Sequence, residues 1–121
     1  MIDMDRFEDQ IYLLNKGVRS CFSDILCGDK KHIEESVKFM REVAHKNGYK
    51  IIFNILPNAL EDFEVKEGKK CYEYYVCKYD HQIKVINRMN NIKDKFMIEF
   101  IKGNLLGYSP DNMEKYLMKV K

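Results

Sequence analysis

Apolar side chains recur at helical spacing along the first 45 residues, and this periodicity constrains the fold more than any other feature. One series, with steps of 4, 3, 4, 3 and 4 residues, runs through Phe7, Ile11, Leu14, Val18, Cys21 and Ile25. It predicts a helix with one buried face that ends at Cys27-Gly28. A second helix is predicted from Asp29 to the stop signal Lys46-Asn47-Gly48, with Ile33, Val37, Met40 and Ala44 on its buried face. The short link between the two helices predicts an antiparallel αα-hairpin.

The middle of the chain has the composition of β-strands. Residues 49–56 are mostly β-branched or aromatic and are followed by Pro57, which predicts one strand. Residues 63–66 and 71–79, separated by a turn at 67–69, predict a hairpin. Alternation within 71–79 assigns one face to Cys71, Glu73, Tyr75, Cys77 and Tyr79, and the other to Tyr72, Tyr74, Val76 and Lys78. We therefore expect a small antiparallel sheet of about three strands, partly buried under helices.

Two further helices are predicted in the last third of the chain. Asp80 caps a long helix that ends at 103–107 and whose apolar positions include Val85, Met89, Ile92, Phe96 and Phe100. An alternative interpretation extends the sheet through 82–86, because this stretch also alternates. Ser109 and Pro110 begin a short last helix, with an apolar face formed by Met113, Tyr116, Leu117 and Val120. The predicted fold class is α+β, with an αα-hairpin, a small sheet, a long helix and a short terminal helix.

Length and composition restrict the classes of protein to be considered. A chain of 121 residues favours one domain covering residues 1–121. With 45% apolar and 33% charged residues, the composition is that of a globular protein and not of a disordered one. No apolar run has the length of a membrane span, and the acidic start lacks the apolar core of a signal peptide. These features predict a cytoplasmic protein without membrane contact.

The four cysteines form two pairs of equal spacing, Cys21 with Cys27 and Cys71 with Cys77. Zinc sites usually use a tighter spacing, and His32, His45 and His81 are scattered, so we predict no metal site and no cofactor. In a reducing compartment the cysteines are interpreted as free thiols. Two disulfides are compatible with the even number of cysteines but lack a secretory context.

The net charge of +2 is distributed unevenly along the chain. Residues 1–45 carry 7 basic and 9 acidic side chains, whereas residues 66–121 carry 12 basic and 7 acidic ones. The chain has only 4 arginines and lacks the dense basic patch of a duplex-DNA binder. The basic C-terminal half favours a small anionic ligand or an acidic protein surface.

Tyrosines and lysines of the predicted sheet are the first candidate ligand-binding residues. Tyr72 and Tyr74 can stack on a nucleobase, while Lys70 and Lys78 can neutralise phosphates. The alternative is that the tyrosines only cover a sheet, a role for which they are well suited.

Basic residues of the predicted long helix form a second set of candidates. Lys84, Arg88, Lys95 and Lys102 fall on one stripe of that helix, which either contacts a phosphate or an acidic partner or is a solvated flank. Ser109 begins a helix whose free N–H groups can bind an anion, although Ser is also an ordinary helix cap.

Catalytic motifs are missing from the sequence. It contains no G-x-S-x-G, no phosphate-binding P-loop, no G-x-G-x-x-G and no H-E-x-x-H. We therefore assign no catalytic residue, and the sequence favours a protein that binds without turnover. The alternative is a small nuclease or hydrolase that uses His81 or Cys21 with a neighbouring carboxylate.

The segment Gly103-Asn104-Leu105-Leu106-Gly107-Tyr108-Ser109-Pro110, followed by Tyr116, resembles the helix–G-x-L-L-G-Y–Pro–helix endings of small accessory proteins from phages and mobile elements. The resemblance covers about the last third of the chain. It implies a compact, often oligomeric protein that acts against a host system by binding. No functional residue is carried over from it.

These observations lead to the hypothesis of a small phage-encoded binding or inhibitory protein. Its target is either a nucleotide-type anionic ligand, which it sequesters, or a host defence protein, which it blocks. The apolar seams of the first and third predicted helices are longer than one small domain is expected to bury, so a homo-oligomer is expected. A structural subunit of a larger assembly is a further alternative.

Overall fold

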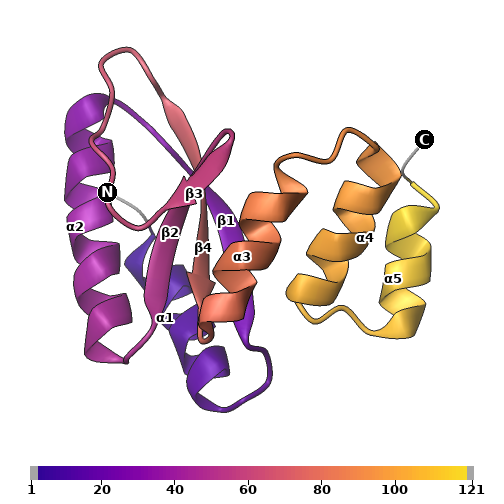
Figure 1. Ribbon diagram of the computed structural model, residues 1–121. Helices are drawn as coiled ribbons and strands as arrows, with labels where there is room; N and C mark the ends of the chain where they lie inside the picture. The colour runs from indigo at the N-terminus through magenta and orange to yellow at the C-terminus, as the bar shows by residue number, and fades with distance from the viewer. Residues whose placement is uncertain (1–2, 120–121) are drawn as a thin grey trace.

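The computed structural model describes residues 3–119 and confirms the α+β class (Figure 1). The elements are α1 (Met4–Asn15), β1 (Cys21–Cys27), α2 (Lys30–Lys46), β2 (Lys50–Ile55), β3 (Asn58–Leu60), β4 (Cys71–Cys77), α3 (Asp80–Met89), α4 (Lys95–Leu105) and α5 (Pro110–Leu117). The strands form one sheet in the order β1-β4-β2-β3, in which neighbouring strands are antiparallel. β1 and β2 are thus parallel to each other on either side of β4, and α2 connects them as the crossover helix of a split β-α-β unit.

The predicted N-terminal αα-hairpin is wrong, because residues 21–27 form strand β1 and not the last turns of a helix. α1 ends at Asn15, and Gly17 follows it with a φ of 73°, a conformation that stops a helix. Gly48, with a φ of 78°, follows the end of α2 in the same way. The helical spacing of Val18 and Ile25 is coincidental, since these side chains are 66% and 61% exposed.

The sheet has four strands, one more than predicted. β2 and β3 form a hairpin in which Ile55 is paired with Asn58, and the Leu56–Pro57 peptide bond within its turn is cis. Residues 63–66 were predicted as a strand but have no strand structure, and they belong to the loop that leads to β4. β4 itself was predicted, and it lies in the interior of the sheet between β1 and β2.

A long C-terminal helix is absent, because the predicted one is divided into α3 and α4. Residues 90–94 separate the two helices, and the Asp94 side chain accepts a hydrogen bond from the Phe96 amide as the N-cap of α4. Residues 82–86 are helical, which excludes the alternative of a strand there. α5 begins as predicted, with Ser109 as N-cap and Pro110 as its first residue. Val120 lies outside the described residues.

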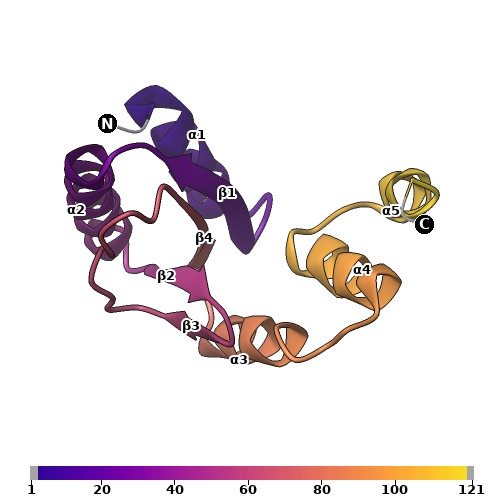
Figure 2. The same cartoon turned by 90° about the horizontal axis from the view of Figure 1, so that it is seen from above.

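Helices cover both faces of the sheet (Figure 2). Each face has its own apolar cluster. The face under α1 and α2, called the first face here, contributes to a buried cluster of Phe7, Ile11, Leu14, Phe22, Leu26, Ile33, Val37, Met40, Ala44, Ile51, Phe53, Tyr72, Tyr74 and Val76. The second face, under α3 and α4, contributes to a buried cluster of Cys21, Ile52, Ala59, Tyr75, Cys77, Ile86 and Met89. The alternation predicted for residues 72–77 is therefore confirmed.

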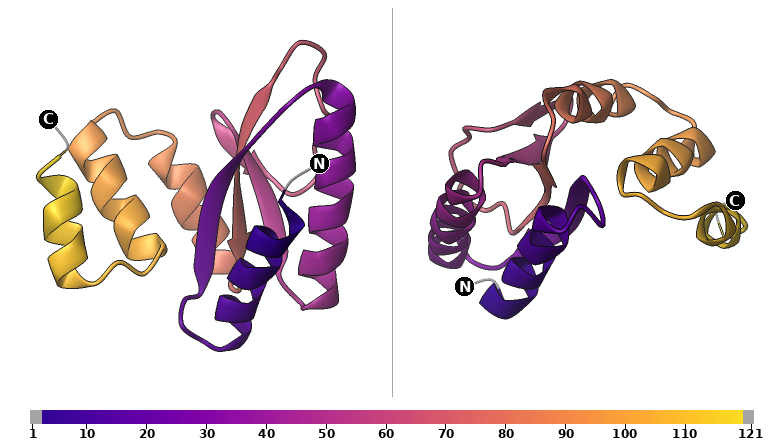
Figure 3. Two further views of the ribbon diagram at one scale, coloured as in Figure 1. Left: turned by 180° about the vertical axis from the view of Figure 1, so that it is seen from behind. Right: turned by 90° about the horizontal axis from the view of Figure 1, so that it is seen from below.

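The α4–α5 hairpin lies beside the sheet-containing body, and α5 packs on the side of α4 that faces away from the sheet (Figure 3). Partly buried residues of α4, among them Ile98, Ile101 and Leu105, connect the hairpin to the second-face cluster. Within residues 3–119, none of the helices combines the length and the apolar character needed to span a membrane.

Candidate binding surface

α4 carries apolar side chains around most of its circumference. Ile98 and Ile101 are partly buried and pack against the second-face cluster. On the outer side of the helix, Phe96, Met97 and Phe100 are 48%, 45% and 42% exposed. A helix that is apolar all round normally lies in a protein interior. Phe96, Met97 and Phe100 therefore form an apolar surface on α4 that the rest of the described chain, α5 included, covers only in part.

α5 provides the second wall of a groove beside this surface. The cavity has a volume of about 530 Å³, and its lining includes Phe96, Phe100, Tyr108, Pro110, Leu117 and Met118. Met118 is 78% exposed and Tyr108 is 42% exposed, so the groove opens to solvent along its length. We call this cavity the docking groove.

The close approach of α4 and α5 depends on the residues that form their turn. Gly103 is buried, and a Cβ atom at this position would lie only 2.4 Å from Cε of Met113 on α5. Tyr108 and Tyr116 meet edge to face with their ring centroids 5.4 Å apart. The Tyr116 hydroxyl also donates a hydrogen bond to the Glu99 carboxylate. Residues 103–110 therefore build the end of α4 and the turn into α5.

A polar cluster on the second face fixes α4 to the sheet. Glu73 of β4 accepts a hydrogen bond from Nζ of Lys102 on α4 at 3.0 Å. Its other carboxylate oxygen accepts hydrogen bonds from the Tyr75 hydroxyl at 2.7 Å and from the Asn54 amide at 3.0 Å. Asn90, just after α3, donates to the side chain of Asn54. The cluster thus joins two strands to the C-terminal helices.

The electrostatics of this cluster favour a positioning role for Glu73. Burial alone would raise the pKa of the Glu73 carboxyl, but hydrogen bonds from Tyr75 and Asn54 and the nearby Lys102 ammonium together hold it below its usual range. The carboxylate is therefore ionised at neutral pH and is saturated with donors. A general acid or base needs a pKa near the working pH, so this environment is unsuited to proton transfer.

The predicted nucleobase-stacking residues lie in the core. Tyr72 and Tyr74 are 3% and 2% exposed and belong to the first-face cluster. Tyr72 packs against Phe63 of the loop before β4, and Tyr74 packs against Phe7 of α1. Neither ring presents an open face to solvent, so the pair does not form a stacking surface in this structure.

The predicted lysine partners do not gather around these tyrosines. Lys70 precedes β4 and Lys78 follows it, so the two lysines lie at opposite ends of that strand. The backbone carbonyl of Lys70 accepts a hydrogen bond from Gly28, and the Lys78 ammonium lies 5.9 Å from the ring centroid of Tyr49. The structure therefore does not bring the four predicted sheet residues together.

The predicted basic stripe is divided between two helices. Lys84 and Arg88 lie on α3, whereas Lys95 and Lys102 lie on α4. Lys102 is already paired with Glu73, so it is not part of an open anion site. Ser109 accepts a hydrogen bond from the Asn112 amide at 3.3 Å, which is the ordinary geometry of a helix N-cap.

The two alternative catalytic residues lie in different surroundings. His81 stacks on Tyr79 with their ring centroids 5.6 Å apart, and Cys21 is buried beside Cys77. Within residues 3–119, neither side chain is hydrogen-bonded to a carboxylate. The same part of the chain contains no group of three or more His, Cys, Asp or Glu residues placed to hold a metal ion.

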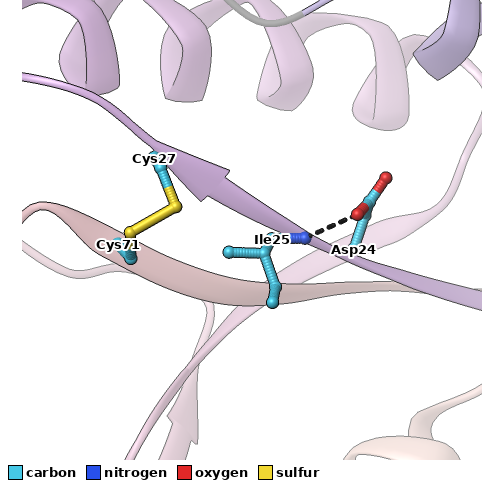
Figure 4. Close-up of a disulfide and its surroundings, with 4 residues drawn as sticks. All are labelled: Asp24, Ile25, Cys27 and Cys71. Atoms are coloured by element: carbon cyan, nitrogen blue, oxygen red, sulfur yellow. Dashed lines mark hydrogen bonds between the residues drawn. A yellow bond between two sulfur atoms is a disulfide. The ribbon is translucent and has the colours of Figure 1, made fainter.

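Two of the four cysteines are not the expected free thiols. Cys27 and Cys71 are opposite each other on β1 and β4 and form a disulfide, with their Cα atoms 4.2 Å apart (Figure 4). Cys21 and Cys77 are paired at the other end of the same two strands, and they remain thiols with their Sγ atoms 3.6 Å apart. The hydrogen bond to Cys77, together with burial, raises the pKa of the Cys21 thiol, which disfavours a nucleophilic thiolate.

Sequence reasoning missed the exposed side of α4. Phe96 and Phe100 were assigned to the buried seam of a long helix, because their spacing continues that of Val85 and Met89. The residues at 90–94 carry the signal that separates Phe96 and Phe100 from Val85 and Met89. The Asn-Asn pair at 90–91 ends α3, and Asp94 caps α4.

Comparisons with protein-family models, with curated proteins and with solved structures find no match to this chain.

Proposed function

We propose that this protein is a binding protein that docks onto another protein through the outer side of α4 and the docking groove, and that it acts without catalytic turnover. The observation that carries this proposal is the exposure of Phe96, Met97 and Phe100 on a helix whose other side is already packed. Contiguous exposed apolar surface of this kind marks interaction sites in folded proteins.

The partner that fits the groove is an amphipathic helix. A groove between two helices accepts the apolar face of a third, whose side chains project at positions i, i+3, i+4 and i+7. The exposed residues of α4 and α5 include both signs of charge, with Lys95 and Lys115 as well as Asp111 and Glu114. Such a rim complements a helix of mixed charge better than a strongly acidic or strongly basic one.

A second copy of the chain meets these requirements, because its α4 has the same apolar outer side and the same mixed charges. Five large side chains of the hairpin, each 42–78% exposed, present roughly 450 Å² of apolar surface. A stable interface buries about 800 Å² per partner, of which a little over half is apolar. The uncovered surface is thus of the size that a two-fold dimer requires, and a dimer is the form in which we expect the isolated protein.

The mode of action that follows is inhibition by occupancy. A docking surface with no catalytic group beside it can block a partner or hold it in place, but it supplies no chemistry. The resemblance of the α4–α5 turn to phage accessory proteins supports a host protein as the target. Sequestration of a nucleotide has less support, because Tyr72 and Tyr74 are buried.

Native mass spectrometry and analytical ultracentrifugation test this proposal with a double variant, Phe96→Glu with Phe100→Glu. We expect the wild type to form dimers at micromolar concentration and the double variant to be monomeric with an unchanged circular dichroism spectrum. Tyr12→Glu is the matched control, because Tyr12 is 58% exposed and lies on α1. This control should dimerise like the wild type.

A fluorescent peptide with the sequence of residues 94–106 serves as a helical probe for the groove itself. We expect it to bind the wild type and to lose affinity for the double variant. A wild type that is monomeric at high micromolar concentration and does not bind this probe would overturn the proposal.

A further inference from the structure

β1 is an edge strand whose free edge is available for hydrogen bonding. It is bonded to β4 on one side, and within residues 3–119 no strand lies on the other. The 4.2 Å separation of the Cys27 and Cys71 Cα atoms is typical of a non-hydrogen-bonded pair. In an antiparallel ladder the next pair should be hydrogen-bonded. Gly28 and Lys70 form such a pair, because the Gly28 amide donates to the Lys70 carbonyl at 2.9 Å. Ser23 and Ile25 have the same parity as Cys27, so their N–H and C=O groups point away from β4.

Two small cavities lie on opposite sides of this edge, and Asp24 and Ile25 contribute to both. One, of about 180 Å³, lies on the α1 side and is lined by Asp3, Arg6 and Gln10 among others. The other, of about 240 Å³, lies on the α4–α5 side and is lined by Glu73 and Lys102 among others. Successive side chains of a strand point to opposite faces, so neighbouring residues of a strand added to β1 would enter the two cavities in turn.

The charges of the cavities define the side chains that they can accept. On the α1 side, the carboxylates of Asp3 and Asp24 outnumber the Arg6 guanidinium. On the α4–α5 side, the Glu73 carboxylate is already paired with the Lys102 ammonium, so this cavity has no excess charge. The cavity on the α1 side therefore complements a lysine or arginine, whereas the one on the α4–α5 side complements an uncharged side chain.

We propose that the free edge of β1 is a strand-addition site for an extended, lysine- or arginine-bearing segment of a partner protein. Main-chain hydrogen bonds to Ser23 and Ile25 provide affinity in this mode, and the acidic cavity on the α1 side provides specificity for the basic side chain. The exposed side chain of Ile25 adds an apolar contact at the centre of the edge.

Asp24 protects the edge when no strand is bound. Its carboxylate accepts a hydrogen bond from the Ile25 amide at 2.8 Å (Figure 4) and pairs with Arg6 at 3.0 Å. An exposed edge with unsatisfied groups promotes aggregation, and a charged side chain at the edge counters this. When a strand is added, one of its carbonyl groups accepts the hydrogen bond of the Ile25 amide in place of Asp24. The Asp24 carboxylate then faces the basic side chain of the partner.

The test uses a fluorescein-labelled peptide of alternating threonine and lysine, as long as β1, in fluorescence-anisotropy titrations. A peptide of alternating threonine and glutamate is the charge control. We expect saturable binding of the basic peptide alone. Binding of both peptides with equal affinity, or of neither, would overturn the proposal.

Ser23→Pro tests the geometry of the edge. Proline removes the outward amide of Ser23 and leaves the backbone hydrogen bonds between β1 and β4 intact, since edge strands accept proline at such positions. We expect the affinity for the basic peptide to fall about tenfold. The double variant Phe96→Glu with Phe100→Glu should bind this peptide like the wild type, which separates this site from the docking groove.

Hydrogen exchange of the wild type keeps the test decisive if Ser23→Pro does not fold. The amides of Ser23 and Ile25 should gain protection when the basic peptide is added. Bound peptide without this protection contradicts the proposal. Self-association that survives the Phe96→Glu with Phe100→Glu double variant but is lost in Ser23→Pro would also contradict it, because the occupant of the edge would then be a second copy.

Discussion

The two faces of the sheet are covered in different ways, and the difference separates stability from binding. On the first face, α1 and α2 enclose a continuous cluster in which Phe7, Phe22 and Tyr74 contact one another. On the second face, only α3 and the inner side of α4 are packed, and a charged pair completes the contact with the sheet. The first face therefore holds the fold together, whereas the second face is completed by α4, whose outer apolar side chains stay about half exposed.

The largest effect is expected from a cavity on the first face. Leu14 is 0% exposed, and Leu14→Ala should lower the free energy of unfolding by about 3–5 kcal/mol, through lost burial and the cavity left behind. Leu60→Ala is the matched control, because Leu60 is 41% exposed and should lose less than about 1 kcal/mol. Urea denaturation followed by circular dichroism measures both changes. If Leu14→Ala and Leu60→Ala lost the same free energy of unfolding, the prediction that the first-face core dominates stability would be wrong.

The disulfide gives the next largest effect. Cys27 and Cys71 are 44 positions apart in the sequence, and the loop that they close holds α2, β2 and β3 but not the α4–α5 hairpin. Reduction should cost about 2–4 kcal/mol of unfolding free energy, chiefly because the unfolded chain gains freedom. The measurement is the urea midpoint with and without dithiothreitol. A Cys27→Ser, Cys71→Ser double variant should not respond to the reductant, and an unchanged wild-type midpoint would contradict the prediction.

Glu73 tests the polar contact of the second face. Glu73→Gln removes the charge that Lys102 pairs with, and we expect it to cost about 1–2 kcal/mol at neutral pH. Because the folded-state pKa of Glu73 lies below its ordinary value of 4.5, this contribution is present above that value and is lost as the pH falls through the folded-state pKa. The difference between wild type and variant should therefore shrink in acid.

Thermal melts of the two proteins between neutral and acidic pH check this dependence. Glu64→Gln is the control, since Glu64 is exposed and should behave like the wild type at every pH. A Glu73→Gln difference that is constant with pH would show that the ionised carboxylate is not the stabilising group.

The smallest change in stability is expected at the rim of the docking groove. Met118 is 78% exposed, so Met118→Ser should alter the free energy of unfolding by less than about 0.5 kcal/mol. The same substitution should weaken self-association and binding of the 94–106 peptide, because it removes apolar surface from the groove. Sedimentation and anisotropy measure these effects, and unchanged association would place Met118 outside the interface.

Local signals in the sequence predicted many of the elements. Helix stops and caps at Asp29, Gly48, Ser109 and Pro110, and the alternation along β4, are confirmed, because each depends on neighbouring residues alone. Gly17 carries the same kind of signal, but the predicted helix runs through it as far as Cys27. Apolar spacing compatible with a helix then concealed β1, whose residues also suit a strand.

The remaining features depend on contacts between distant residues. Glu73 and Lys102 are 29 positions apart, so no local pattern could pair them. The equal spacing of Cys21 from Cys27 and of Cys71 from Cys77 did contain information. Once β1 and β4 are aligned antiparallel, this spacing places Cys21 opposite Cys77 and Cys27 opposite Cys71. Recognising this required β1 to be a strand, and the error at Gly17 therefore also concealed the disulfide.

The position of β4 in the sheet has a consequence for protein synthesis. β4, which lies between β1 and β2, is the last of the four strands to be synthesised. Cys21 can pair with Cys77 only after 56 further residues have been added to the chain. While the ribosome adds this part of the chain, β1 and β2 have no strand between them, and their apolar residues lack the sheet that later buries them. Pairing at such long sequence separation slows folding. The nascent N-terminal half therefore depends on β4, and a chain released before residue 71 would expose strand edges prone to aggregation.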